Sequence, residues 1–158
     1  MSRTVAVLFA AALAFSPGFA LAGAAEDAYL ARLIGVWKGT GALTGDETAA
    51  IACTLTVRQR SEGVNFSSKC KVEGLGNQNF SAVISYNDKE GRYEAKSAGG
   101  EVTIGTRKGN TLTFNAKMKG IAVGTSVMKL SPSAIVVDTT VRRPGGDADI
   151  VSHMEMKR

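Results

Sequence analysis

The sequence predicts an all-β fold, an antiparallel up-and-down β-barrel of about ten strands preceded by a short N-terminal helix. Two observations support this prediction. From residue 35 onward, apolar and polar residues alternate with the period of two that is typical of strands with one buried face. Short turn sequences separate these runs, so consecutive strands are expected to pair as a meander. Closing the meander removes its two exposed edges, whereas a two-sheet sandwich has similar strand signals and stays an alternative.

Residues 1–22 have the pattern of a secretory signal peptide. Arg3 gives a positive start, residues 5–15 are apolar, and a helix breaker at 17–18 precedes a small-x-small cleavage sequence at 20–22. The apolar run is too short for a membrane-spanning helix, which needs about 20 apolar residues. We therefore expect a periplasmic or secreted protein with one domain over residues 23–158.

A short helix over residues 25–33 is expected to come first, followed by a strand over residues 36–43. The only tryptophan of the chain, Trp37, lies at this junction between Gly35 and Gly39. Glycines allow close approach of neighbouring backbones, and a large indole can fill the space beside them. We interpret Trp37 as a structural plug that closes one end of the barrel.

The next two strands are expected to form a hairpin held by a disulfide between Cys53 and Cys70. Two cysteines in an exported chain are expected to pair. A tight turn over residues 60–63 places Cys53 directly opposite Cys70, and the same register builds one mostly apolar face that includes Val57 opposite Phe66. A redox role is less favoured, because the Cys-x-x-Cys motif is missing.

Seven further strands are expected from the alternation, at about residues 79–87, 92–97, 101–107, 112–118, 121–127, 135–141 and 150–156. Between two of them, Lys119 and Gly120 predict a two-residue hairpin loop. This loop would pair Phe114 with Thr125, so that Thr125 and Val127 would face the barrel interior.

The charge pattern argues against nucleic acid as a partner. The formal net charge is +5, and the basic residues of the second half are spread over several strands with no interleaved aromatic ladder. At most we expect weak contact with an acidic membrane surface or an anionic ligand. Nothing in the sequence points to a particular oligomeric state.

Residues 33–41, Leu-Ile-Gly-Val-Trp-Lys-Gly-Thr-Gly, resemble the lipocalin-like and nitrobindin-like bacterial domains of unknown function within the calycins. A hairpin like that over residues 85–93 is also common in this group. The resemblance implies a single lipocalin-like β-barrel domain. It also implies that a basic residue near the end of the last strand, here Lys157 or Arg158, packs across the tryptophan.

We expect no catalytic site, no metal site and no cofactor. Nucleophilic catalysis needs a base beside Ser or Cys, but the chain has one histidine, no Gly-x-Ser-x-Gly motif and cysteines that are expected to pair. Nitrobindin-like proteins bind haem through a histidine, yet His153 shares its strand face with Val151 and Glu155 and is expected to face solvent. Asp147 and Asp149 are more typical of turn residues than of cation ligands.

The inward positions combine aromatic and methionine side chains with small residues. This composition predicts a non-enzymatic barrel that binds a small hydrophobic ligand, with a lining that includes Phe66, Phe80, Tyr86, Phe114, Met154 and Met156. A packed core would have the same composition. The alternative function is a protein-binding module, such as a periplasmic protease inhibitor that uses its N-terminal segment 23–28; haem binding is less favoured.

Overall fold

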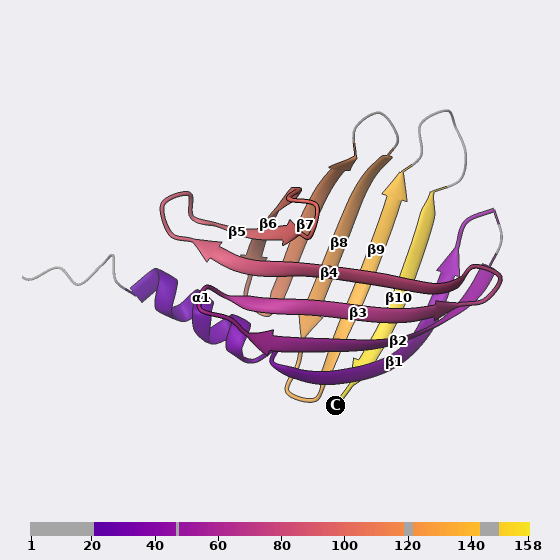
Figure 1. Cartoon of the computed structure of the whole chain (residues 1–158), viewed down its shortest axis with the longest axis horizontal. Helices are drawn as coiled ribbons and strands as arrows, with labels where there is room; N and C mark the ends of the chain where they lie inside the picture. Colours follow the sequence, from indigo (N-terminus) through magenta and orange to yellow (C-terminus); the bar gives the residue numbers. More distant parts are fainter. Residues whose placement is uncertain (1–20, 47, 119–121, 143–148) are drawn as a thin grey trace, which may run out of the picture.

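The computed structural model describes residues 21–46, 48–118, 122–142 and 149–158. One helix is followed by ten strands, which close into an antiparallel barrel in the order β1-β10-β9-β8-β7-β6-β5-β4-β3-β2 (Figure 1). The predicted barrel is confirmed, and the sandwich alternative is wrong. Of the predicted signal peptide, residues 1–20 lie outside the described residues.

The elements follow the predicted ones closely. Helix α1 comprises Leu21–Ala31, and the strands are β1 Gly35–Thr44, β2 Thr48–Gln59, β3 Val64–Val72, β4 Gly76–Asn87, β5 Arg92–Ser97, β6 Val102–Lys108, β7 Thr111–Met118, β8 Ala122–Leu130, β9 Ala134–Arg142 and β10 Ile150–Lys157. The helix ends two residues before the predicted boundary, because the amides of Arg32 and Leu33 bond to carbonyls three residues back and tighten the chain into a turn. Within the described chain, no helix has the length and apolarity needed to span a membrane.

The β2–β3 hairpin has the predicted register, with Cys53 opposite Cys70 and a disulfide between them. The turn is closed by a hydrogen bond from the Arg60 amide to the Gly63 carbonyl. Gly63 has a φ of +78°, and a Cβ there would overlap the backbone of Ile84 on β4. Glycine is therefore required at this turn both for its backbone conformation and for the close approach of β4.

The predicted register between β7 and β8 is wrong. Phe114 pairs with Ser126 instead of Thr125, and Met118 pairs with Ala122, so the connection is one residue longer than predicted; its residues 119–121 lie outside the described chain. A shift of one residue moves every side chain of a strand to the other face. Thr125 and Val127 consequently share the outer face of β8, and the buried Met128 belongs to its inner face.

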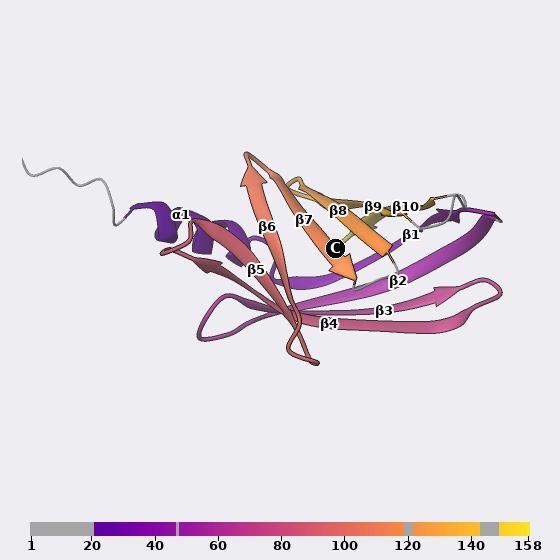
Figure 2. The ribbon, with the colours of Figure 1, turned by 90° about the horizontal axis from the view of Figure 1, so that it is seen from above.

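The buried core is concentrated at the end of the barrel where α1 lies. Figure 2 shows α1 at this end, with β3 and β4 on one side of the barrel and β8, β9 and β10 on the other. The largest fully buried side chains are Trp37, Tyr93, Leu30, Leu33, Leu55, Leu112, Ile135, Val57 and Val64. We refer to the part of the barrel built by these residues and α1 as the closed end.

Candidate ligand-binding site

Trp37 is fully buried at the closed end, beneath the turn that follows α1. Its indole Nε1 donates a hydrogen bond to the Leu33 carbonyl at 2.8 Å. The guanidinium of Arg158 lies 4.3 Å from the centre of the indole ring and donates hydrogen bonds to the carbonyls of Arg32 and Ile34. Arg158, rather than Lys157, is therefore the basic residue that crosses the tryptophan, and it ties the end of the chain to the turn after α1.

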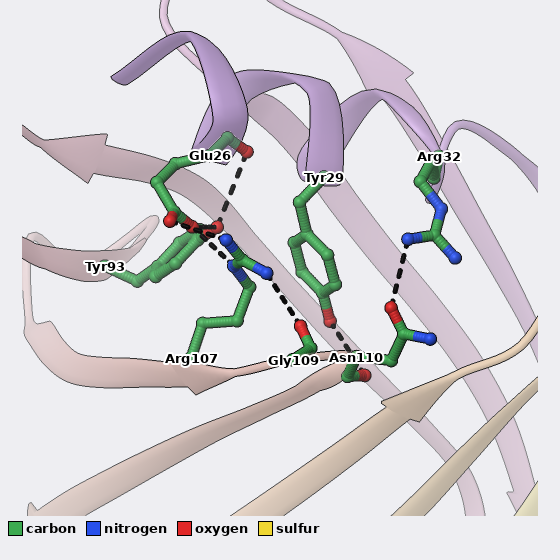
Figure 3. A network of polar contacts seen from close by, with 7 residues as sticks. All are labelled: Glu26, Tyr29, Arg32, Tyr93, Arg107, Gly109 and Asn110. Atoms are coloured by element: carbon green, nitrogen blue, oxygen red, sulfur yellow. Dashed lines mark hydrogen bonds and ion pairs between the residues drawn. The ribbon is translucent and has the colours of Figure 1, made fainter. Parts of the chain in front are cut away.

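A half-buried ion pair joins α1 to the barrel wall (Figure 3). Arg107 on β6 contacts both carboxylate oxygens of Glu26, with Nε 2.5 Å from Oε2 and Nη2 2.6 Å from Oε1. The hydroxyl of Tyr93 on β5 donates to the same Oε2 at 2.5 Å. Arg107 lowers the pKa of the Glu26 carboxyl, whereas burial and the bond to Glu26 raise the pKa of Tyr93. The Glu26 carboxylate and the Arg107 guanidinium thus neutralise each other, and the Tyr93 hydroxyl adds a hydrogen bond to the carboxylate.

Aromatic contacts complete this end. Tyr29 of α1 meets Tyr93 edge-on at 6.2 Å between ring centres and lies under the guanidinium of Arg107, at 5.0 Å. Burial raises the pKa of Tyr29, which favours its neutral form. The helix is also held by Arg32, which donates to the Asn110 side chain at 3.1 Å (Figure 3). At the closed end, these polar groups therefore bond to one another and fasten α1 to the barrel.

The inner wall further from α1 is far less tightly filled. We call its half-exposed part, around Phe66, Ser68 and Phe80 on β3 and β4 and Ala116 on β7, the open half. Phe80 is 55% exposed although it occupies an inward position of β4, opposite Ser68. Its ring meets that of Phe66 edge-on, with 6.2 Å between ring centres. An aromatic pair on the inner wall that solvent still reaches is a surface that a ligand can cover.

A row of hydroxyl groups crosses the facing wall of the barrel. Ser126 on β8, Thr139 on β9 and Ser152 on β10 are paired side by side and are half-buried. The Thr139 hydroxyl donates to the Ser126 hydroxyl at 3.3 Å. These inward hydroxyls supply donors and acceptors without charge, so they suit an uncharged polar group on an otherwise apolar ligand.

A pocket of about 520 Å³ opens at the rim away from α1. It is lined by Leu43, Ala49 and Ile150, which occupy inward strand positions, and by the loop residue Leu75, which is 64% exposed. The remaining lining comes from Gly45, Asp46, Thr48, Glu73 and Gly74. The pocket connects apolar inner wall to an acidic rim.

The structure does not bring all six predicted ligand-lining residues into one site. Phe66 and Phe80 touch each other in the open half, and the Phe114 ring lies over Gly105, where a Cβ would collide with it. Tyr86 instead meets Tyr93 at 5.1 Å between ring centres, and Met154 and Met156 are buried in the core. The hydroxyl row and the Glu26–Arg107 pair were not predicted as site features.

His153 lies on the outer face of β10, as its position in the strand predicts. It is exposed, and its Nδ1 is 2.6 Å from Oδ1 of Asp138 on β9. Among the described residues, no group of three or more His, Cys, Asp or Glu side chains is arranged to hold a metal ion. His153 is thus separated from the interior by the barrel wall.

No protein-family model and no curated protein matches the sequence. Among solved structures, an S-type phycobiliprotein lyase from Guillardia theta matches with a TM-score of 0.68 and 13% identity, covering 84% of this chain and 92% of the lyase. The zebrafish ileal bile acid-binding protein, solved with cholic acid, matches with a TM-score of 0.43 and 13% identity over 80% of this chain and 98% of that one. The likeness to the lyase shows that the two proteins share the fold of a closed antiparallel β-barrel.

Proposed function

We propose that this protein is an exported, non-enzymatic barrel that binds a small hydrophobic ligand in its open half. The observation that carries the proposal is Phe80, an aromatic residue that is inward by its strand position and yet 55% exposed. Leaving half of a large apolar side chain in water forgoes about 1 kcal/mol of burial, which a bound ligand would recover. The Phe66–Phe80 pair would supply apolar contacts to such a ligand, and the hydroxyl row would supply polar ones.

The fold alone does not decide between binding and catalysis, since the phycobiliprotein lyase is by its name an enzyme. Our preference for binding rests on the chemistry of the inner wall. In the described part of the barrel, the polar side chains at inward positions of the open half are hydroxyls and the Gln78 amide, and Glu26 and Arg107 neutralise each other at the closed end. A nucleophile held beside a base, which covalent catalysis requires, is not formed by these groups.

Export is supported by the composition of residues 1–22 and by the disulfide, because such bonds persist in oxidising compartments. The two other predicted functions have less support. The segment 23–28 lies in α1, where Glu26 is bound to Tyr93 and Arg107, and His153 lies on the outer face. These positions favour neither insertion into a protease nor haem binding in the interior.

A fluorescent long-chain lipid titrated into the purified protein tests the proposal. Ala116 is half-buried on the inner face of β7, so Ala116→Trp should fill the open half and weaken binding on the order of tenfold or more, a loss of about 1.4 kcal/mol. Ala42→Trp, which adds the same bulk to an exposed position of β1, is the control and should bind normally. If the unmodified protein binds no member of a broad lipid panel, the proposal is wrong.

A further inference from the structure

A second concave surface lies on the outside of the barrel wall. This outer groove has a volume of about 980 Å³ and runs across β10, β1, β2, β3 and β4. Its lining consists of Lys38, Gly39, Thr40, Ala52, Cys53, Thr54, Lys69, Cys70, Lys71, Asn77, Asn79, Glu155 and Lys157. Apart from Gly39, Cys53 and Cys70, whose strand positions face inward, the lining side chains come from outward strand positions, so the groove opens on the outer face and is separate from the proposed interior site.

The strand registers arrange these side chains in two rows across the five strands. The first row, in order, is Lys157, Lys38, Thr54, Lys69 and Asn79, and the second is Glu155, Thr40, Ala52, Lys71 and Asn77. Neighbouring strands lie about 4.8 Å apart, so Lys38 and Lys69, two strands apart, begin about 10 Å from each other. The middle residues of the two rows, Thr54 and Ala52, have small side chains, so the surface is hollowed between the lysines on either side of them.

The groove is strongly basic for its size. Four lysines and one glutamate give a formal charge of +3 (four minus one) among the lining residues. Glu155 contacts Lys157, with Oε1 and Nζ 3.2 Å apart. Among the described residues, Lys38, Lys69 and Lys71 have no ion pair. Their charges are available to a ligand.

One pair breaks a rule of strand pairing. Lys38 and Lys157 lie directly opposite each other on β1 and β10, and like charges in such a pair are destabilising. Natural proteins retain local conflicts of this kind mainly where function requires them. An anion between the two ammonium groups would turn the repulsion into a binding contribution.

We propose that the outer groove binds an anionic polysaccharide. Lysine ammonium groups would contact its carboxylate or sulfate groups, and the Thr and Asn side chains would hydrogen-bond to its hydroxyls. None of the lining residues is aromatic, which disfavours single-stranded nucleic acid, since its bases stack on such side chains. The strands are paired in a closed barrel, so the groove offers no free strand edge to an extended peptide.

Titration of the full chain at low ionic strength tests this proposal, with heparin and polygalacturonate as anionic probes and dextran as the neutral one. The two anionic polysaccharides should bind with affinities that fall as salt is added, and dextran should not bind. Neutralising the groove in the double variant Lys38→Gln/Lys69→Gln should weaken binding on the order of tenfold. Circular dichroism and thermal unfolding establish that each variant is folded.

The matched control is Lys96→Gln/Lys108→Gln, which removes the same charge from exposed positions on β5 and β6 outside the groove. It should retain the affinity of the unmodified chain. Equal losses in the two double variants would overturn the proposal, because positive charge anywhere on the surface would then suffice. Absence of binding by the unmodified chain would also overturn it, as would tighter binding to polyglutamate or to vesicles of anionic phospholipid.

Discussion

The closed end and the open half are built from the same strands but differ in how their side chains are satisfied. At the closed end, Trp37 is buried and hydrogen-bonded, and the Glu26–Arg107 pair is enclosed by two tyrosines. In the open half, Phe80 is more than half exposed, with the half-buried Phe66 beside it and Ser68 opposite it. The contrast indicates that the closed end contributes more to the stability of the fold than the open half, where we propose that a ligand binds.

The largest effect is expected from a substitution at the closed end. Trp37→Ala removes a fully buried indole, its hydrogen bond to Leu33 and its contact with Arg158, so the free energy of unfolding should fall by about 3–5 kcal/mol. Phe80→Ala, by comparison, should cost about 1 kcal/mol or less, because the side chain is 55% exposed. Urea unfolding of both variants measures the difference.

If Trp37→Ala does not fold, Trp37→Phe retains most of the ring and isolates the loss of the Nε1 donor to the Leu33 carbonyl. It should still destabilise the protein more than Phe80→Ala. Equal effects of the Trp37 and Phe80 variants would contradict the division into a stabilising end and a binding half.

The sequence predicted the β2–β3 hairpin better than the β7–β8 hairpin, and the reason is periodicity. Where hydrophobic alternation is strong, as along the Cys53–Cys70 hairpin, one register buries a whole face, and that register was correct. Between β7 and β8 the pattern is ambiguous, because Val127 and Met128 favour opposite faces. The predicted register between β7 and β8 therefore rested on the predicted two-residue loop at 119–120, which is one residue shorter than the actual connection.

The second prediction concerns the disulfide, which joins β2 and β3 beyond Phe66 and Ser68, on the side of the open half away from α1. The cysteines are separated by 17 residues in the sequence, and closing a loop of about this length is worth about 3 kcal/mol. Cys53→Ser/Cys70→Ser should therefore lower the free energy of unfolding by about 3 kcal/mol. The effect should be smaller than that of Trp37→Ala.

Hydrogen exchange tests whether loss of the disulfide affects the open half before the closed end. In the double Ser variant, amides of β3 near Phe66 should lose protection before those around Trp37, because the crosslink no longer holds the open half. Uniform loss of protection over both regions would show instead that the barrel unfolds as one unit. Ligand affinity of the same variant reports whether the crosslink also shapes the open half.

The Glu26–Arg107 pair could not be predicted from sequence, for a reason that is specific to β6. Apolar Val102 and Ile104 suggest that their face of the strand is inward, yet Val102 is 48% exposed and Arg107 takes the inner position. Glu26 and Arg107 are 81 residues apart in the sequence, so no local sequence pattern links them. An inward arginine on β6 is stabilised only because α1 packs beside it and supplies the carboxylate of Glu26 as its partner.

A smaller effect than those of Trp37→Ala and the disulfide variant is expected from Glu26→Gln, which removes the charge of the carboxylate and leaves Arg107 without its ionic partner. Hydrogen bonds to charged groups are worth about 1.5–3 kcal/mol, and near pH 7 the variant should lose about 2 kcal/mol. Glu94→Gln is the matched control. Glu94 bonds to Arg92 on the same strand, but that arginine is more exposed, so the loss should be below about 1 kcal/mol.

The pH dependence distinguishes this charge effect from a packing effect. Arg107 holds the pKa of Glu26 below its ordinary value of 4.5 in the folded chain, so the unfolded chain takes up the proton first as the pH falls. The stabilisation by Glu26 is complete above about pH 4.5 and is lost as the pH falls toward the lower folded pKa. The difference in unfolding free energy between unmodified chain and Glu26→Gln should therefore shrink over this acidic range. A constant difference from pH 7 to pH 3 would assign the loss to packing, and the closed end would then owe its stability to its aromatic side chains alone.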